Sequence, residues 1–237
     1  MQRDGMKGKK ALSGLCLAAA VLVIVWVSWR NGIVNYYLVS TLALLLSLAA
    51  FFLSYERKKP TAQELVLLAV LCAVAVVGRM AFAAVPFFKP AAAIVILTGI
   101  AFGGQAGCLC GAASMLVSNF FFGQGAWTPW QMLAFGVAGL LAGVCFRSGR
   151  LPRTRLTLTL FGALCVLMPV GLILDTSSLF LMTSDPLTVD SALAIYLAGV
   201  SANVIHAAAT AFFLFLIGPV VLEKLEQKTT KKGVLWR

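Results

Sequence analysis

Apolar runs separated by short polar segments dominate the chain from its beginning to its end. About 20 apolar residues are enough to cross a bilayer as a helix, and a helix satisfies its own backbone hydrogen bonds in lipid. The runs lack the residue-by-residue alternation of a membrane β-barrel. They cover residues 11–29, 36–54, 64–82, 91–103, 106–120, 131–146, 156–174 and 191–218. The pattern predicts an all-α integral membrane protein in which two helices precede a group of six.

The fourth and fifth runs are shorter than the others and meet at Gly103, Gly104 and Gln105. They could form two thin spanning helices or one re-entrant hairpin, and either arrangement returns the chain to the same side of the membrane. Glycines spaced four residues apart let helices pack closely in lipid. Such pairs are Gly99 and Gly103, Gly107 and Gly111, and Gly139 and Gly143.

Basic residues are placed unevenly along this pattern, and the net charge is +11. With the N-terminus inside, every Lys and Arg except Arg30, Arg79 and Lys89 falls in a segment predicted to be cytoplasmic. Cytoplasmic loops of membrane proteins carry such an excess of Lys and Arg. We therefore expect a multi-pass protein with both termini in the cytoplasm, and orientation rather than nucleic-acid binding explains the charge.

The composition argues against a soluble domain and against an enzyme. The chain is 61% hydrophobic and only 11% charged, too little charge for a hydrated surface. It has no P-loop, so we do not expect it to use ATP itself. It also has no G-x-S-x-G motif, no H-E-x-x-H motif and a single histidine, and its six cysteines all lie in apolar runs. We expect no metal site and no cofactor.

The segment 118–132, SNFFFGQGAWTPWQM, combines aromatic rings with amide groups. An aromatic belt at the membrane interface would explain its tryptophans. A pocket for a flat polar ligand would also explain the amides and glycines beside them, and we favour the pocket. Its candidate substrate-binding residues are Asn119, Gln124, Trp127, Thr128, Trp130 and Gln131.

Five further polar or charged residues are candidates for the same site. Arg79 and Lys89 could line its mouth, although Arg79 could instead extend to the lipid headgroups. Asp175, predicted at the outer end of its helix, could pair with Arg79. Asn203 and His206 are three apart on the last helix and could contact ligand or form an interhelical hydrogen bond. The helix interiors are expected to hold no acidic residue, which argues against proton-coupled transport.

The chain resembles the substrate-specificity (S) component of energy-coupling factor (ECF) transporters. The resemblance covers about residues 62–222 and rests on the six-helix group, the pair Ala69-x-x-x-Ala73, and the stretches 78–99 and 118–132. The last stretch is similar to the branch assigned to cobalamin. The resemblance as a whole implies a six-helix core at 61–222. This core is preceded by a 1–60 extension with two transmembrane helices and followed by a basic cytoplasmic tail at 223–237.

The resemblance also implies a mechanism. An S component binds a vitamin from outside the bacterial cytoplasmic membrane, associates with a membrane coupling subunit and two ATPase subunits, and topples to release its substrate inside. Ala69 and Ala73 would face the coupling subunit, and the loops 83–90 (with Phe87), 119–130 and 175–190 would close over the substrate. We expect cobalamin or a related corrinoid. Another flat heterocycle, such as a queuosine precursor, is the alternative, and a membrane enzyme acting on lipid-like substrates is an alternative of another class.

Overall fold

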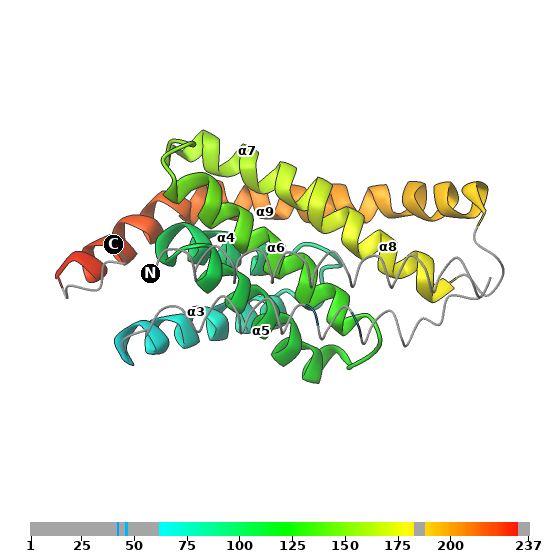
Figure 1. Cartoon of the computed structure of the whole chain (residues 1–237), viewed down its shortest axis with the longest axis horizontal. Coiled ribbons are helices and arrows are strands. Elements are labelled where there is room, and N and C mark those ends of the chain that lie inside the picture. Colours follow the sequence, from blue (N-terminus) through cyan, green and yellow to red (C-terminus); the bar gives the residue numbers. More distant parts are fainter. Residues whose placement is uncertain (1–41, 43–45, 47–61, 183–187, 232–237) are drawn as a thin grey trace, which may run out of the picture.

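The computed structural model describes residues 42, 46, 62–182 and 188–231, and in this part the chain is a bundle of helices (Figure 1). The two helices predicted within 1–60 lie almost entirely outside the described residues. The bundle consists of α3 (Ala62–Ala81), α4 (Ala91–Phe102), α5 (Gly104–Phe122), α6 (Thr128–Arg147), α7 (Arg155–Cys165), the π-helical turn η1 (Val166–Val170), α8 (Gly171–Met182) and α9 (Val189–Lys231). Because α7, η1 and α8 follow one another without a break, the predicted group of six helices is confirmed.

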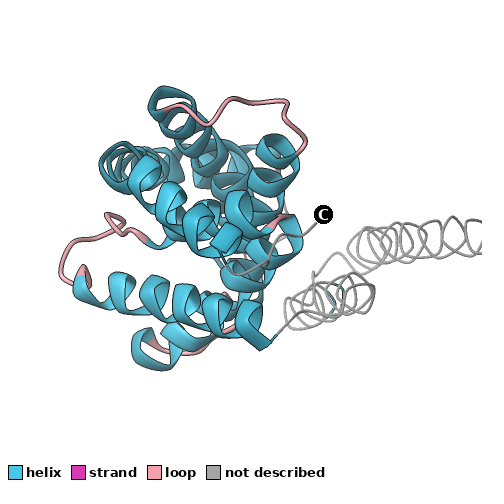
Figure 2. Ribbon diagram, turned by 90° about the vertical axis from the view of Figure 1, so that its left-hand side faces the viewer, coloured by secondary structure: helices cyan, strands magenta, loops and turns pink. Residues whose placement is uncertain are grey.

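Figure 2 shows only helices and connecting loops in the described part of the bundle. Five of these helical segments are long and apolar enough to cross a membrane. They are Ala62–Ala81, Gly104–Phe122, Thr128–Arg147, Arg155–Leu181 and Val189–Leu225. The protein is therefore an all-α membrane protein.

The short helix α4 forms the centre of the described bundle. It is apolar on every face, as expected of a helix that is surrounded by others. All but one of its residues are buried, and it packs against α3, α5, α6 and α9. Its 12 residues span about 18 Å, less than the roughly 30 Å of a hydrocarbon core. Of the two arrangements considered for 91–120, the structure has two separate helices joined at Gly103, and only α5 is long enough to span.

Glycines bring α4, α5 and α6 into backbone contact. A Cβ atom built on Gly99 would lie 2.1 Å from the carbonyl oxygen of Gly139, and one on Gly143 would lie 2.0 Å from the backbone nitrogen of Gly104. A Cβ on Gly107 would also meet Gly139, at 2.6 Å. Only glycine permits this approach, so the predicted role of these glycines in close packing is confirmed.

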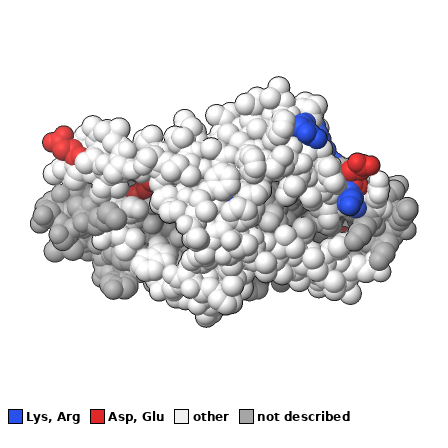
Figure 3. Space-filling view, turned by 180° about the vertical axis from the view of Figure 1, so that it is seen from behind, with Lys and Arg blue, Asp and Glu red and all other residues white. Residues whose placement is uncertain are grey.

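The two ends of the bundle differ in charge. We call the end where α3, α5 and α8 finish the loop end, and the end where α4, α6 and α9 finish the basic end. Figure 3 shows charged side chains at both ends and an almost uncharged surface between them. Described basic residues at or near the basic end are Arg147, Arg150, Arg153, Arg155 and Lys224. This distribution fits a cytoplasmic basic end, and the orientation itself stays a prediction.

Three predicted boundaries were wrong. The loop expected at 119–130 is confined to 123–127, because α5 continues to Phe122 and α6 begins at Thr128. The segment from Asp175 onward was expected to be a polar loop, but α8 continues to Met182, so Asp175 lies inside a helix rather than at its end. The hydroxyl groups that made this segment look like a loop bond to carbonyls one turn earlier: Thr176 to Leu172 at 2.6 Å and Ser178 to Leu174 at 3.2 Å. They are thus satisfied without leaving the helix. The last helix also extends beyond its predicted end, into the predicted tail, as far as Lys231.

Candidate functional site

A hydrogen-bond network at the loop end is centred on Asn119. Its side chain is fully buried. Its Oδ1 accepts from Nη1 of Arg79 at 2.7 Å, and its Nδ2 donates to Oγ1 of Thr128 at 3.0 Å and to Oε1 of Gln131 at 2.9 Å. The same Nη1 donates to the hydroxyl of Ser118. The network joins α3, α5 and α6 and uses both hydrogens of the amide, so Asn119 positions its neighbours.

Gln124 extends the network into the loop between α5 and α6. Its Oε1 accepts from the Thr128 hydroxyl at 2.9 Å, and its Nε2 donates to the carbonyl of Leu116 at 2.9 Å. The backbone N–H of Gly125 also donates to Thr128, at 3.3 Å. These contacts fix the 123–127 loop onto the start of α6.

Two cations lie over one aromatic ring beside this network. The guanidinium carbon of Arg79 is 4.7 Å from the centroid of the Phe122 ring, and Nζ of Lys89 is 5.3 Å from it. Such positions over an aromatic face are favourable for a cation. The structure therefore brings Arg79 and Lys89 together with the 118–131 segment, as the sequence suggested.

The other face of α6 carries aromatic rings toward α8 and α9. Trp130 is buried, and its ring centroid lies 5.8 Å from that of Phe180 on α8. One and a half turns further along, Phe135 lies 5.6 Å from the imidazole of His206 on α9. Helix α6 thus presents amide and hydroxyl groups to α5 and flat apolar surfaces to α8 and α9.

A second polar cluster joins α8 to α9. Asp175 accepts a hydrogen bond of 2.7 Å from Nδ2 of Asn203. The suggested pairing of Asp175 with Arg79 was therefore wrong, because α8 packs against α6 and α9 whereas α3 packs against α4 and α5. The expectation that no helix interior holds an acid was wrong for the same residue. Thr176 shares a 2.7 Å hydrogen bond with the hydroxyl of Tyr196.

The loop from 82 to 90 packs onto the last helix. The rings of Phe82 and Phe88 lie 5.3 Å and 5.6 Å from that of Phe213. Phe87 instead is 51% exposed and has a φ of 59°, a left-handed conformation that costs a bulky residue energy. The loop is thus anchored by two rings and presents the third outward at the loop end.

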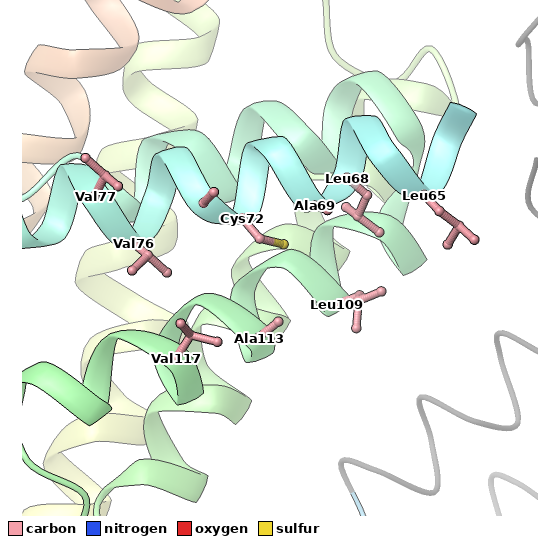
Figure 4. Close-up of a pocket in the computed structure, with 10 residues that line it drawn as sticks. Leu65, Leu68, Ala69, Cys72, Val76, Val77, Leu109, Ala113 and Val117 are labelled. Atoms are coloured by element: carbon pink, nitrogen blue, oxygen red, sulfur yellow. The ribbon is translucent and has the colours of Figure 1, made fainter. Parts of the chain in front are cut away.

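Helices α3 and α5 enclose an apolar groove on the side of the bundle, with a volume of about 470 Å³ (Figure 4). Ala69 and Ala73 both line it and both are exposed. Its remaining lining residues are Leu65, Leu68, Cys72, Val76, Val77, Leu109, Ala113 and Val117. The groove therefore combines small side chains on α3 with an uncharged floor, a surface suited to another helix in lipid.

A sequence model of the family described as "ECF-type riboflavin transporter, S component" matches residues 59–225. This range contains every helix of the described bundle, except that α9 continues beyond it to Lys231. The chain belongs to this family of ECF transporter S components. No match to the chain was found among curated proteins or among solved structures.

Family membership settles the class of the protein. As an S component it is the substrate-binding membrane subunit of an ECF transporter, a transporter part rather than an enzyme, and it associates with the ECF transmembrane and ATPase subunits. The predicted S component is confirmed. The predicted cobalamin-type branch is not supported, because the matching family is the riboflavin type.

Sequence reasoning missed several residues of the S component's two clusters. Ser118 and Phe122 lie in the candidate segment 118–132, but their contact with Arg79 depends on the packing of α3 against α5. Tyr196 and Thr176 were overlooked because each stands among apolar or hydroxyl residues. A tyrosine inside an apolar run is itself a usable signal, because its hydroxyl needs a partner there.

Replacement of both Trp127 and Gln131 by alanine should weaken substrate binding by about tenfold or more, the usual range for an aromatic anchor. Trp127 is 40% exposed at the start of α6, so its loss opens no core cavity, and Gln131 holds one branch of the Asn119 network. Titration of substrate onto the purified S component measures the effect. Gln105→Ala, near the basic end on α5, is the control and should bind normally. Unaltered affinity of the double variant would show that this segment is only an interfacial belt.

Proposed function

We propose that this S component binds a flavin, riboflavin or a close relative, at the loop end of its bundle. The observation that carries the proposal is the match of residues 59–225 to the riboflavin-type family. The chemistry of the loop end supports it. A flavin joins a flat, largely apolar ring system to polar edge groups and a hydroxylated chain. Such a ligand needs aromatic walls and a few placed hydrogen-bonding groups.

The faces of α6, α8 and α9 offer this combination. Trp130, Phe180 and Phe135 supply flat surfaces. Asp175, Asn203 and His206, set along the same helices, supply acceptors and donors for the edge of the ring system. We assign these residues, with Thr176 and Tyr196, to substrate recognition.

The structure weakens the reasoning that led to cobalamin. That reasoning took Asn119, Gln124 and Gln131 as amides lining a wide mouth. In the structure Asn119 bonds directly to Gln131 and to Arg79, and Thr128 links Asn119 to Gln124, so the three amides belong to one network. Amide groups that bond within this network position the helices, and few of them are left for a large amide-rich ligand.

The α3–α5 groove is the proposed contact with the ECF transmembrane subunit. An S component must bind this subunit through surface that otherwise faces lipid, and the groove offers uncharged surface with exposed Ala69 and Ala73. Small side chains let a partner helix approach closely with little loss of side-chain freedom. In this arrangement the loop end faces outward, the basic end faces the cytoplasm of a bacterium, and ATP is used by the partner subunits.

Fluorescence titration of riboflavin with the purified full-length S component tests the substrate. Flavin fluorescence should be quenched on stacking against the aromatic residues, with saturation at one flavin per chain. Trp130→Ala should weaken this binding, and Phe146→Leu, at the other end of α6, should not. Saturable binding of cobalamin with no binding of riboflavin would overturn the proposed substrate.

A further inference from the structure

Three positively polarised groups come from adjoining segments at the loop end, a region that we call the cationic corner. They are the side chains of Arg79 and Lys89 and the N-terminus of α4, which begins directly after Pro90. Gly78 allows these segments to adjoin: a Cβ atom there would lie 2.8 Å from the ring of Pro90. Because Gly78 has no side chain, the start of α4 can lie directly against the last turn of α3, which carries Arg79.

The N-terminus of α4 is buried and has no side-chain cap. Ala91, Ala92 and Ala93 are at most 1% exposed, and within the described part of the chain the start of α4 has no side-chain cap hydrogen bond. The first N–H groups of a helix lack partners within the helix and carry partial positive charge. Such helix ends bind anions readily.

Neither cation of the corner is neutralised by the described residues. Among these residues Asp175 is bonded to Asn203, and no ion pair to Arg79 or Lys89 is formed. Nη1 of Arg79 serves Ser118 and Asn119, while the guanidinium has further N–H donors. Burial and the nearby charge of Arg79 lower the pKa of Lys89. The two like charges near the Phe122 ring therefore repel each other, and an anion in contact with both would remove that cost.

We infer that the cationic corner binds a phosphate group of the substrate, so that the S component prefers a phosphorylated flavin to the neutral one; this rests on the proposed flavin function. A phosphate monoester carries a charge of about −1.5 to −2 near neutral pH and has three acceptor oxygens. It can accept from Arg79, from Lys89 and from the first turn of α4 together. The aromatic faces of α6 then hold the ring system of the same molecule.

The decisive experiment compares riboflavin with riboflavin 5′-phosphate in fluorescence titrations of the full-length protein in lipid-free detergent. The phosphate ester should bind at least about tenfold more tightly, which corresponds to about 1.4 kcal/mol. In Lys89→Gln and in Arg79→Lys the ratio of the two affinities should fall toward one. Lys224→Gln, near the basic end, should keep the wild-type ratio. Equal affinities in the wild type, or an unchanged ratio in Lys89→Gln, would overturn the inference.

A second measurement keeps this test separate from the flavin proposal. Inorganic phosphate at millimolar concentration should slow modification of Lys89 by an amine-reactive reagent, measured by mass spectrometry, and should leave Lys224 unaffected. If neither flavin binds, the flavin proposal fails, and protection of Lys89 by phosphate still supports an anion site. Absence of that protection overturns the site.

Lipid headgroups also carry phosphate groups, so a separate experiment must distinguish them from a soluble ligand. Labelling is therefore repeated in nanodiscs of phosphatidylglycerol. Protection of Lys89 there, with none from inorganic phosphate or riboflavin 5′-phosphate in detergent, would assign the corner to lipid and overturn the substrate assignment. Protection by both soluble phosphates in detergent supports it.

Discussion

A chain that carries Ala69→Leu together with Ala73→Leu should lose transport and keep its substrate binding. Both alanines are exposed in the α3–α5 groove, one helical turn apart. Leucines there would fill the space that a partner helix needs, at a cost of about 1–3 kcal/mol for each overpacked side chain. The affinity for the ECF transmembrane subunit should then fall on the order of a hundredfold. Substrate binding is retained because Ala69 and Ala73 line the groove and take no part in the hydrogen bonds of the two polar clusters.

The matched control for this variant is Ala194→Leu with Ala198→Leu. This pair has the same four-residue spacing on α9 and is also exposed, but it lies outside the groove. Co-purification with the coupling complex and substrate uptake by reconstituted vesicles are measured for both variants. Normal uptake by the Ala69 and Ala73 variant would remove the groove from the docking surface. Equal loss in both variants would point to general damage instead.

Gly139→Ala should strongly destabilise the bundle. A Cβ atom at this position would lie 2.3 Å from the backbone of Gly107 on α5, and backbone cannot move aside as a flexible side chain can. Alanine normally favours a helix over glycine by about 1 kcal/mol, so a loss of stability would reverse the usual sign. We expect a cost of at least about 1–3 kcal/mol, seen as a lower midpoint of thermal unfolding in detergent.

Gly218→Ala is the comparison on α9. Its Cβ would meet the Leu158 side chain at an ordinary 3.4 Å, so this variant should be as stable as the wild type or slightly more so. Unfolding at the wild-type midpoint by Gly139→Ala would contradict the close contact of α5 and α6.

The sequence predicted the helices well where apolar length decides the outcome. The predicted helix at 131–146, for example, is observed as Thr128–Arg147. The segment after Asp175 was misjudged because the sequence shows a polar cluster, whereas its hydroxyls bond within α8 and its carboxylate bonds Asn203. Composition alone does not show where a polar side chain finds its partner.

The candidate residues were found more easily than their contacts. The 118–132 segment stood out by its aromatic and amide content, and the structure unites Asn119, Gln124, Thr128 and Gln131 in one network. The partner of Asp175 could not be predicted, since it depends on which helices adjoin. Nor does a sequence show that Asn119 donates its amide hydrogens to Thr128 and Gln131. These bonds are what distinguish a residue that positions its neighbours from one that contacts the ligand.

Uptake of labelled riboflavin by cells that lack their own flavin transport tests the central claim most directly. Cells receive this chain and an ECF coupling module, either alone or together, and a module with inactive ATPase subunits serves as control. The account predicts uptake only when the chain and the active module are both present. Uptake by the chain without a module, or with the inactive one, would contradict its role as the substrate-binding subunit of an ECF transporter.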